Sequence, residues 1–226
     1  MTSEITSALL WYGIFLLSTV LHEAAHGLVA LWGGDRTAFL EKQVSMNPIP
    51  FIKREPAGML VIPVLSVMLQ GWVIGWGSTP YSPNWAKAFP RRAAFMSLAG
   101  PAANLTLAGA AFGYAYPKVS SGIWQISAQL NFESLFYSLN PADSGLVRII
   151  SITLSLNLIL AVFNLIPIPP LDGSGALGLI LPKKTYSHFQ EKARKPTARI
   201  LGLLAAWYCL DYLISPVFQT VLSFLS

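Results

Sequence analysis

The chain is poor in cysteine and in charge. Its single cysteine among 226 residues, Cys209, excludes an intrachain disulfide and a cysteine-rich metal site. Charged residues make up only 11% of the chain and hydrophobic residues 54%, whereas soluble domains have about 25% charged residues. This balance predicts an integral membrane protein. In a soluble protein the net charge of +5 would indicate nucleic-acid binding, but here the bases gather between apolar stretches, so we expect no nucleic-acid partner.

Five apolar stretches alternate with polar connections, and several reach the ~20 residues that span a bilayer. They cover residues 5–31, 57–77, 93–116, 146–168 and 200–225. We therefore expect an all-α polytopic membrane protein with four to five transmembrane helices. Residues 1–226 are predicted to form a single membrane-embedded domain, with a core at 5–182 and a C-terminal helix at 197–226. Because no basic region or cleavage pattern precedes the first stretch, it is expected to stay in the mature protein.

The distribution of Lys and Arg predicts which connections face the cytoplasm. The connection 182–199 carries six bases and 78–92 carries three, whereas 117–145 carries only Lys118. The first two are therefore predicted to be cytoplasmic and the third to lie outside. This assignment places the C-terminal ends of the first and fourth apolar stretches on the same, cytoplasmic, side.

The charge pattern does not allow the second apolar stretch to be a simple membrane span. If its two flanking connections, 33–56 and 78–92, are both cytoplasmic, residues 57–77 cannot simply cross the membrane once. We expect a re-entrant or β-hairpin-like segment around 57–90, with prolines and glycines at the bend. Non-helical backbone at that depth needs cover from protein or a wet cavity. The alternative is a true span beside a basic connection that does not face the cytoplasm.

The motif His22-Glu23-Ala24-Ala25-His26 lies inside the first apolar stretch. Residues i and i+4 share a helix face, with Cβ atoms about 5–6 Å apart, so His22 and His26 can ligate one metal ion. Glu23 can serve as general base for a metal-bound water, whose pKa zinc lowers to roughly 7. Polar side chains within a membrane are costly, which favours a metal site over the alternative of interhelical hydrogen bonding.

A catalytic zinc needs a third protein ligand and one open position. Asp172 is the best candidate, because it ends the fourth apolar stretch on the predicted side, after helix-breaking prolines and before Gly173. The alternative for Asp172 is that it merely caps a following helix. Other acids and the remaining histidine are placed less favourably, in polar connections: Glu41, Glu55, Glu133, His188 and Glu191.

Three motifs in order resemble one family. His22 to His26 is followed by Gly100-Pro101-Ala102-Ala103-Asn104 and by the run Asn-Leu-Ile-Pro-Ile-Pro-Pro-Leu-Asp-Gly at 164–173. Together they resemble the site-2 protease family of intramembrane zinc metalloproteases, peptidase family M50. Residues 47–77 also resemble its compact prokaryotic branch, which lacks PDZ and CBS domains. The resemblance covers residues 15–182.

The resemblance implies a function and a site. One zinc ion per chain would be held by His22, His26 and Asp172, with Glu23 as catalytic base. The implied reaction is hydrolysis of peptide bonds in transmembrane or membrane-proximal segments of a protein substrate, with a zinc-activated water as nucleophile. The implied location is a prokaryotic cytoplasmic membrane, crossed several times, with the active site toward the cytoplasmic side.

Three asparagines lie near these motifs. The resemblance implies that Asn104 faces the active site, where an amide could donate to an oxyanion or hold the substrate backbone. The alternative for Asn104 is an amide satisfied between helices. Asn157 and Asn164, seven residues apart on one helix face, are expected to bridge helices.

The chain departs from the family's pattern at residues 77–83. Similar proteins read Ala-Lys-Pro-Val-Pro-Val after the Gly-Trp pair, whereas this chain reads Gly-Ser-Thr-Pro-Tyr-Ser-Pro. An exposed edge strand here is expected to hold an extended substrate by backbone pairing. The altered residues bear on the register of that strand and on substrate preference, not on the zinc site.

Two other functions remain open. One is a membrane-surface zinc peptidase with a Glu as third ligand. The other is a non-catalytic membrane scaffold or transport subunit that kept the pattern. Asp211, within the last apolar stretch, is expected to bond a tyrosine or face a wet surface rather than to act at the zinc.

Overall fold

The computed structural model describes residues 2–129 and 131–225, and most of them are helical. Three segments are long and apolar enough to cross a membrane, and a fourth span results if a pair bent by 42° at Pro196–Leu210 and Tyr212–Ser223 counts as one. This agrees with a polytopic helical protein. Three spans are fewer than the four to five expected, and four reach the lower end of that range. The helices that carry these segments are α1 (Thr2–Trp32), α6 (Pro90–Ser120), α7 (Ser144–Leu165) and α10 (Pro196–Ser223).

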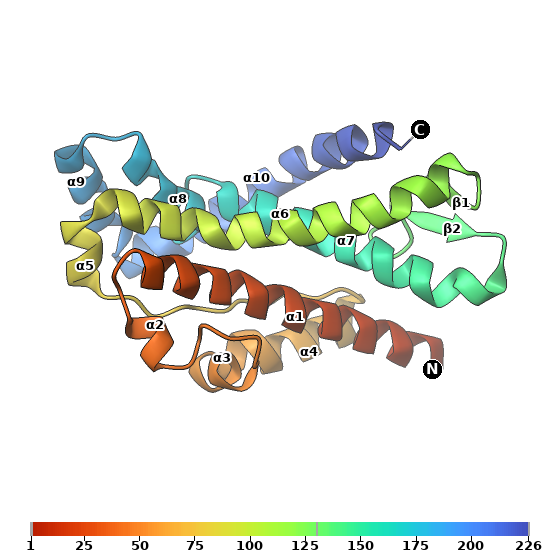
Figure 1. Cartoon of the computed structure of the whole chain (residues 1–226), viewed down its shortest axis with the longest axis horizontal. Helices are drawn as coiled ribbons and strands as arrows, with labels where there is room; N and C mark the ends of the chain where they lie inside the picture. Colours follow the sequence, from red (N-terminus) through yellow and green to blue (C-terminus); the bar gives the residue numbers. More distant parts are fainter. Residues whose placement is uncertain (1, 130, 226) are drawn as a thin grey trace.

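The core lies between α1, α6 and α7, whose axes run along the long direction of the molecule (Figure 1). Trp11 and Phe15 of α1 pack with Ile152 and Leu156 of α7. Alanines on one face of α6 join a second cluster, which also contains residues of α7 and α10. The small side chains of these alanines let α6 and α7 approach closely. This cluster includes Ala108, Ala111, Ala115, Leu154, Leu158 and Phe218.

A glycine and a buried aspartate follow the C-terminal end of α1. Gly34 adopts a φ of +97°, a conformation that residues with a side chain avoid. Asp35 is buried, and its carboxylate accepts hydrogen bonds from the backbone N–H of Thr37 at 3.0 Å and of Ser82 at 2.6 Å. The end of α1 is therefore tied to the start of α5 (Pro83–Ala88).

Residues 37–82 leave α1 and return to it. Short helices α2 (Thr37–Leu40) and α3 (Ile49–Arg54) lead through η1 (Ala57–Val61) into α4 (Ile62–Gln70). The chain then turns at Gly71, with a φ of +80°, and runs back in an extended form; we call residues 71–82 the return segment.

The return segment brings the chain back to the level at which η1 begins. The backbone N–H of Trp76 donates to the carbonyl of Gly58 at 3.1 Å, and Figure 1 shows the chain doubling back beside α4 toward α5. The two ends of the segment 57–77 therefore lie side by side, a geometry that suits a re-entrant segment. The β-hairpin-like expectation was wrong, because residues 57–90, all described, contain no paired strand. Gly58 and Gly75 instead let helix and extended chain pack directly together.

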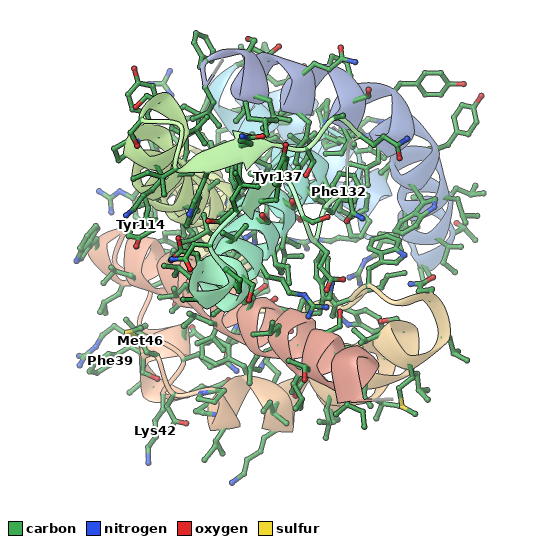
Figure 2. The ribbon with its side chains drawn as sticks, turned by 90° about the vertical axis from the view of Figure 1, so that its right-hand side faces the viewer. Phe39, Lys42, Met46, Tyr114, Phe132 and Tyr137 are labelled. Atoms are coloured by element: carbon green, nitrogen blue, oxygen red, sulfur yellow. The ribbon has the colours of Figure 1, made fainter. Side chains whose placement is uncertain are left out.

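The strands of the structure lie in the charge-poor connection instead. β1 (Trp124–Ile126) and β2 (Phe136–Ser138) pair antiparallel, with Gln125 opposite Tyr137. The all-α expectation is corrected to this extent. Figure 2 looks onto this end of the molecule and labels Tyr137 on β2 and Phe132 beside it. The ring of Phe132 lies 5.1 Å from that of Phe218, so the connection is anchored on α10.

The two ends of the molecule differ in charge as predicted. The strands lie at one end, and the basic connections, which contain α5 and α9, lie at the other (Figure 1). The remaining elements follow α6 and α7 in the chain: η2 (Pro141–Asp143), α8 (Asp172–Ala176), η3 (Leu177–Leu179) and α9 (Lys183–Ala193).

Replacing Gly58 by Ala tests the packing of the return segment. A Cβ at this position would lie 2.7 Å from Cδ2 of Trp76, so the two segments must separate. We expect Gly58→Ala to lower the stability by about 1–3 kcal/mol, the usual cost of overpacking. Gly109→Ala is the matched control, because a Cβ there has no neighbour within 4 Å and alanine favours a helix. Equal thermal unfolding midpoints for the two purified variants would contradict this packing.

Candidate metal centre

Helix α1 presents two imidazoles on one face. His22 and His26, one helical turn apart, are both 6% exposed, and their rings meet edge to face with centroids 4.7 Å apart. Their Nε2 atoms lie 3.1 Å from each other. The spacing of four residues predicts this convergence, and the structure contains it.

Asp172 reaches the same point from the other side of the bundle. After α7 ends, the prolines of residues 166–171 cannot continue a helix, and the chain turns before Asp172 opens α8. The Oδ2 atom of Asp172 lies 3.1 Å from Nε2 of His22 and 3.2 Å from Nε2 of His26. The carboxylate therefore faces the imidazoles, which favours the ligand over the helix-cap interpretation.

The three side chains form a compact donor set. One atom from each lies within 4.8 Å of the others, and in the described part of the chain no second such group of His, Cys, Asp or Glu is found. Burial alone would raise the pKa of the Asp172 carboxyl, whereas positive charge beside it, as on His26 and His22 when they are protonated, holds the pKa below its usual value. A carboxylate that stays ionised beside two imidazoles suits a divalent cation.

A third helix, α6, holds both imidazoles through hydrogen bonds to their Nδ1 atoms. His22 Nδ1 lies 2.5 Å from Oδ1 of Asn104, and His26 Nδ1 lies 2.7 Å from the carbonyl oxygen of Met96. Because both partners are hydrogen-bond acceptors, each Nδ1 carries the proton and each Nε2 presents its lone pair to the site. This arrangement orients both rings as metal ligands.

Glycine at position 100 makes room for the donor atoms. A Cβ there would clash with Nε2 of both His22 and His26. Met96, Gly100 and Asn104 are spaced by four, so they lie along one face of α6. That face supplies a carbonyl acceptor, a gap and an amide in turn, which explains why glycine and asparagine stand four residues apart in this motif.

The amide of Asn104 belongs to a buried network. It is fully buried, and its Nδ2 donates to Oδ1 of Asn157 at 2.8 Å. Asn157 in turn donates to Oγ of Ser18 at 3.0 Å, which confirms that it bridges helices. Asn164 instead donates to the carbonyl of Leu160 in its own helix. Contact of Asn104 with a substrate stays a prediction, since its described partners are His22 and Asn157.

Glu23 lies beneath the return segment. Its side chain is buried, and the hydroxyl of Thr79 is 2.7 Å from its Oε2. Sequence reasoning did not single out Thr79, Ser18 or the carbonyl of Met96, because no motif marks a hydroxyl or a backbone oxygen. Only the departure from the family's pattern at residues 77–83 drew attention to the stretch that contains Thr79.

The other acidic candidates for a third ligand lie elsewhere. Glu133 pairs with Arg148 and accepts from Ser7 near the strands. Glu41 pairs with Arg54 at 3.0 Å, and Glu55 accepts from Ser78 at 2.6 Å. His188 and Glu191 are on α9. The side chain of Asp211 lies outside the described residues.

Comparison with known proteins identifies the class. The model of peptidase family M50 matches residues 11–206, so the chain belongs to this family, which confirms the resemblance. The motif residues His22, Glu23, His26, Asn104 and Asp172 all lie in the matched region. No solved structure matches the chain.

Bacterial relatives are similar over most of the chain. "Putative zinc metalloprotease YwhC" of Bacillus subtilis (strain 168) is 30% identical over 74% of this chain and 67% of its own length. "Putative zinc metalloprotease Rip2" of Mycolicibacterium smegmatis is 31% identical over 72% of this chain and 54% of its own length. The protein of that name from Mycobacterium tuberculosis (strain Erdman) is 29% identical over 78% and 62%. The chain thus spans between about half and two thirds of these relatives.

Replacing Gly100 by Ala tests the donor set. The added methyl group must displace Nε2 of both imidazoles, so we expect metal affinity to fall about tenfold or more. Gly113→Ala on the same helix is the control, because a Cβ there meets nothing within 4 Å. Competition with a chelator, followed by elemental analysis of the purified proteins, measures the affinity. Equal metal retention by the two variants would place the metal elsewhere.

Proposed function

We propose that this chain is an intramembrane zinc endopeptidase that hydrolyses transmembrane or membrane-proximal segments of proteins. The observation that carries the proposal is the meeting of buried His22 and His26 with half-buried Asp172 inside a bundle of apolar helices. Membership of family M50 and the printed names of the relatives, which include "zinc metalloprotease", support the same activity.

The donor set fits zinc. Two imidazoles and a carboxylate are common ligands of catalytic zinc, and they leave a fourth position open. Zinc–nitrogen bonds of about 2.0–2.1 Å in a tetrahedron separate the donor atoms by about 3.3 Å. The three donor atoms of this site are separated by 3.1–3.2 Å. Zinc bound here would supply a Lewis acid and lower the pKa of a coordinated water toward about 7.

Glu23 is the proposed proton carrier. Oε2 of the carboxylate accepts a hydrogen bond from the hydroxyl of Thr79, whereas Oε1 accepts none from any described residue. Oε1 can therefore take the proton from the attacking water and pass it to the leaving amine. Burial keeps bulk water from competing for this proton.

The return segment is the proposed holder of the substrate. Its backbone from Gly77 to Thr79 is extended and makes no backbone–backbone hydrogen bond in the described chain. An unwound peptide could pair with these free groups, as extended peptides do at an open strand edge. In this proposal Asn104 acts mainly through His22, and its contact with the substrate remains to be tested.

The proposed topology places the site toward the cytoplasm of a bacterial cell. The basic connections and the ends of α1 and α7 that carry the site lie at one end of the molecule. The positive-inside rule assigns that end to the cytoplasm. The third-ligand alternative, a glutamate, is disfavoured by the contacts of Glu41, Glu55 and Glu133 with other partners.

Two substitutions separate chemistry from metal binding. We expect Glu23→Gln to keep one zinc per chain and to lower kcat for a model transmembrane substrate by about 10²- to 10⁴-fold, because the amide cannot accept the proton. Asp172→Ala should lose both zinc and cleavage. Glu191→Gln on the exposed face of α9 is the control and should match the wild type. Cleavage that survives in Glu23→Gln would refute this mechanism.

Thiol labelling tests the proposed orientation. In a Cys209→Ala background, single cysteines replace exposed Lys192 on α9 and exposed Ser121 after α6. A membrane-impermeant maleimide should label Ser121→Cys in intact cells and Lys192→Cys only after permeabilisation. The reverse pattern would place the site on the outer side.

A further inference from the structure

The return segment crosses α1 at Glu23 with almost no gap. A Cβ on Gly77 would lie 2.7 Å from Cγ of Glu23, 3.1 Å from its Oε1 and 3.1 Å from Cγ2 of Thr19. Glycine at this position therefore allows the extended chain to lie directly on the carboxylate. The contact brings the next residues, Ser78 and Thr79, within hydrogen-bonding distance of fixed partners.

We propose that Thr79 is a positioning residue for Glu23. Its Oγ1 lies 2.7 Å from Oε2 of Glu23 and 2.7 Å from the backbone carbonyl of the same residue. The hydroxyl has one proton, and a carboxylate oxygen is a stronger acceptor than a peptide carbonyl. Donation to Oε2 fixes the rotation of the carboxylate and leaves Oε1 for the reaction. This inference rests on the proposed function of Glu23.

The neighbouring residue holds Thr79 in place. The hydroxyl of Ser78 donates to Oε1 of Glu55 at 2.6 Å and accepts from Nε of Arg54 at 3.1 Å. Arg54 is itself paired with Glu41 at 3.0 Å. On the other side Pro80 restricts the backbone of Thr79 to extended conformations. The hydroxyl therefore stands on a segment that is anchored at both flanks.

The contacts of this stretch depend on its side-chain hydroxyls. A proline at position 79 would have no hydroxyl to donate to Glu23, and a lysine at position 78 would have no short hydroxyl to bridge Glu55 and Arg54. The stretch is therefore held by side-chain hydrogen bonds, one of which reaches the proposed base.

The test compares Thr79→Val, which keeps the shape and removes the hydroxyl, with Thr79→Ser, which restores it. Each zinc-loaded variant is assayed on a model transmembrane substrate, with Thr220→Val as a control for the same change on exposed α10. We expect Thr79→Val to keep its zinc and its KM and to lose about 10- to 100-fold in kcat, the range for a hydrogen bond to a charged group. Thr79→Ser should recover most of that loss.

A double-mutant cycle measured by thermal unfolding tests the contact without an activity assay. Thr79→Val, Glu23→Ala and the double variant should have non-additive shifts in Tm, whereas Thr220→Val combined with Glu23→Ala should be additive. A wild-type kcat in Thr79→Val, or additive Tm shifts in the cycle of Thr79→Val and Glu23→Ala, would overturn the proposed role of Thr79 and leave the proposed function standing. A zinc-loaded wild type that cleaves no membrane substrate would instead overturn the proposed function on which the inference rests.

Discussion

The structure depends on the cost of burying two imidazoles and a carboxylate among apolar helices. Such groups are expensive in a membrane unless they meet partners that satisfy them. Here the outer ring nitrogens of both imidazoles meet acceptors on α6, and the inner nitrogens converge with Asp172 across the gap between α1 and α8, where the proposed zinc would satisfy all three donors. Because the donors come from distant parts of the chain, the site can form only when these helices pack together.

Helix α6 turns this meeting into an ordered site. Its face of Met96, Gly100 and Asn104 holds the outer nitrogens of both imidazoles and leaves no room for a side chain near the inner ones. Asn157 and Ser18 extend the same network into α7 and α1, so the polar layer also fixes the register of the bundle. The residues of this polar layer, Gly100, Asn104, Asn157 and Ser18, are small or hydrogen-bonded, as expected where helices associate without a hydrophobic driving force.

The sequence was informative where chemistry repeats at a fixed spacing. The spacing of four positions from His22 to His26 predicted a shared face, and the position of Asp172 after prolines predicted its depth. Long apolar stretches and basic connections predicted the helices and the opposite character of the two ends. Non-local packing was not predictable: nothing in residues 124–138 marks a two-stranded sheet, and the return segment is extended without a partner strand. The contact between Thr79 and Glu23 joins residues 56 apart and needed the folded chain to be seen.

The central claim is that the two histidines of α1 and the aspartate after α7 hold one zinc ion. X-ray absorption at the zinc edge of the purified protein tests it most directly, because it counts and identifies the ligands. The account predicts one zinc per chain with two imidazoles and otherwise oxygen ligands at about 2.0–2.2 Å, and loss of that signal in Asp172→Ala. A sulfur ligand, a third imidazole from His188, or a signal unchanged in Asp172→Ala would contradict it.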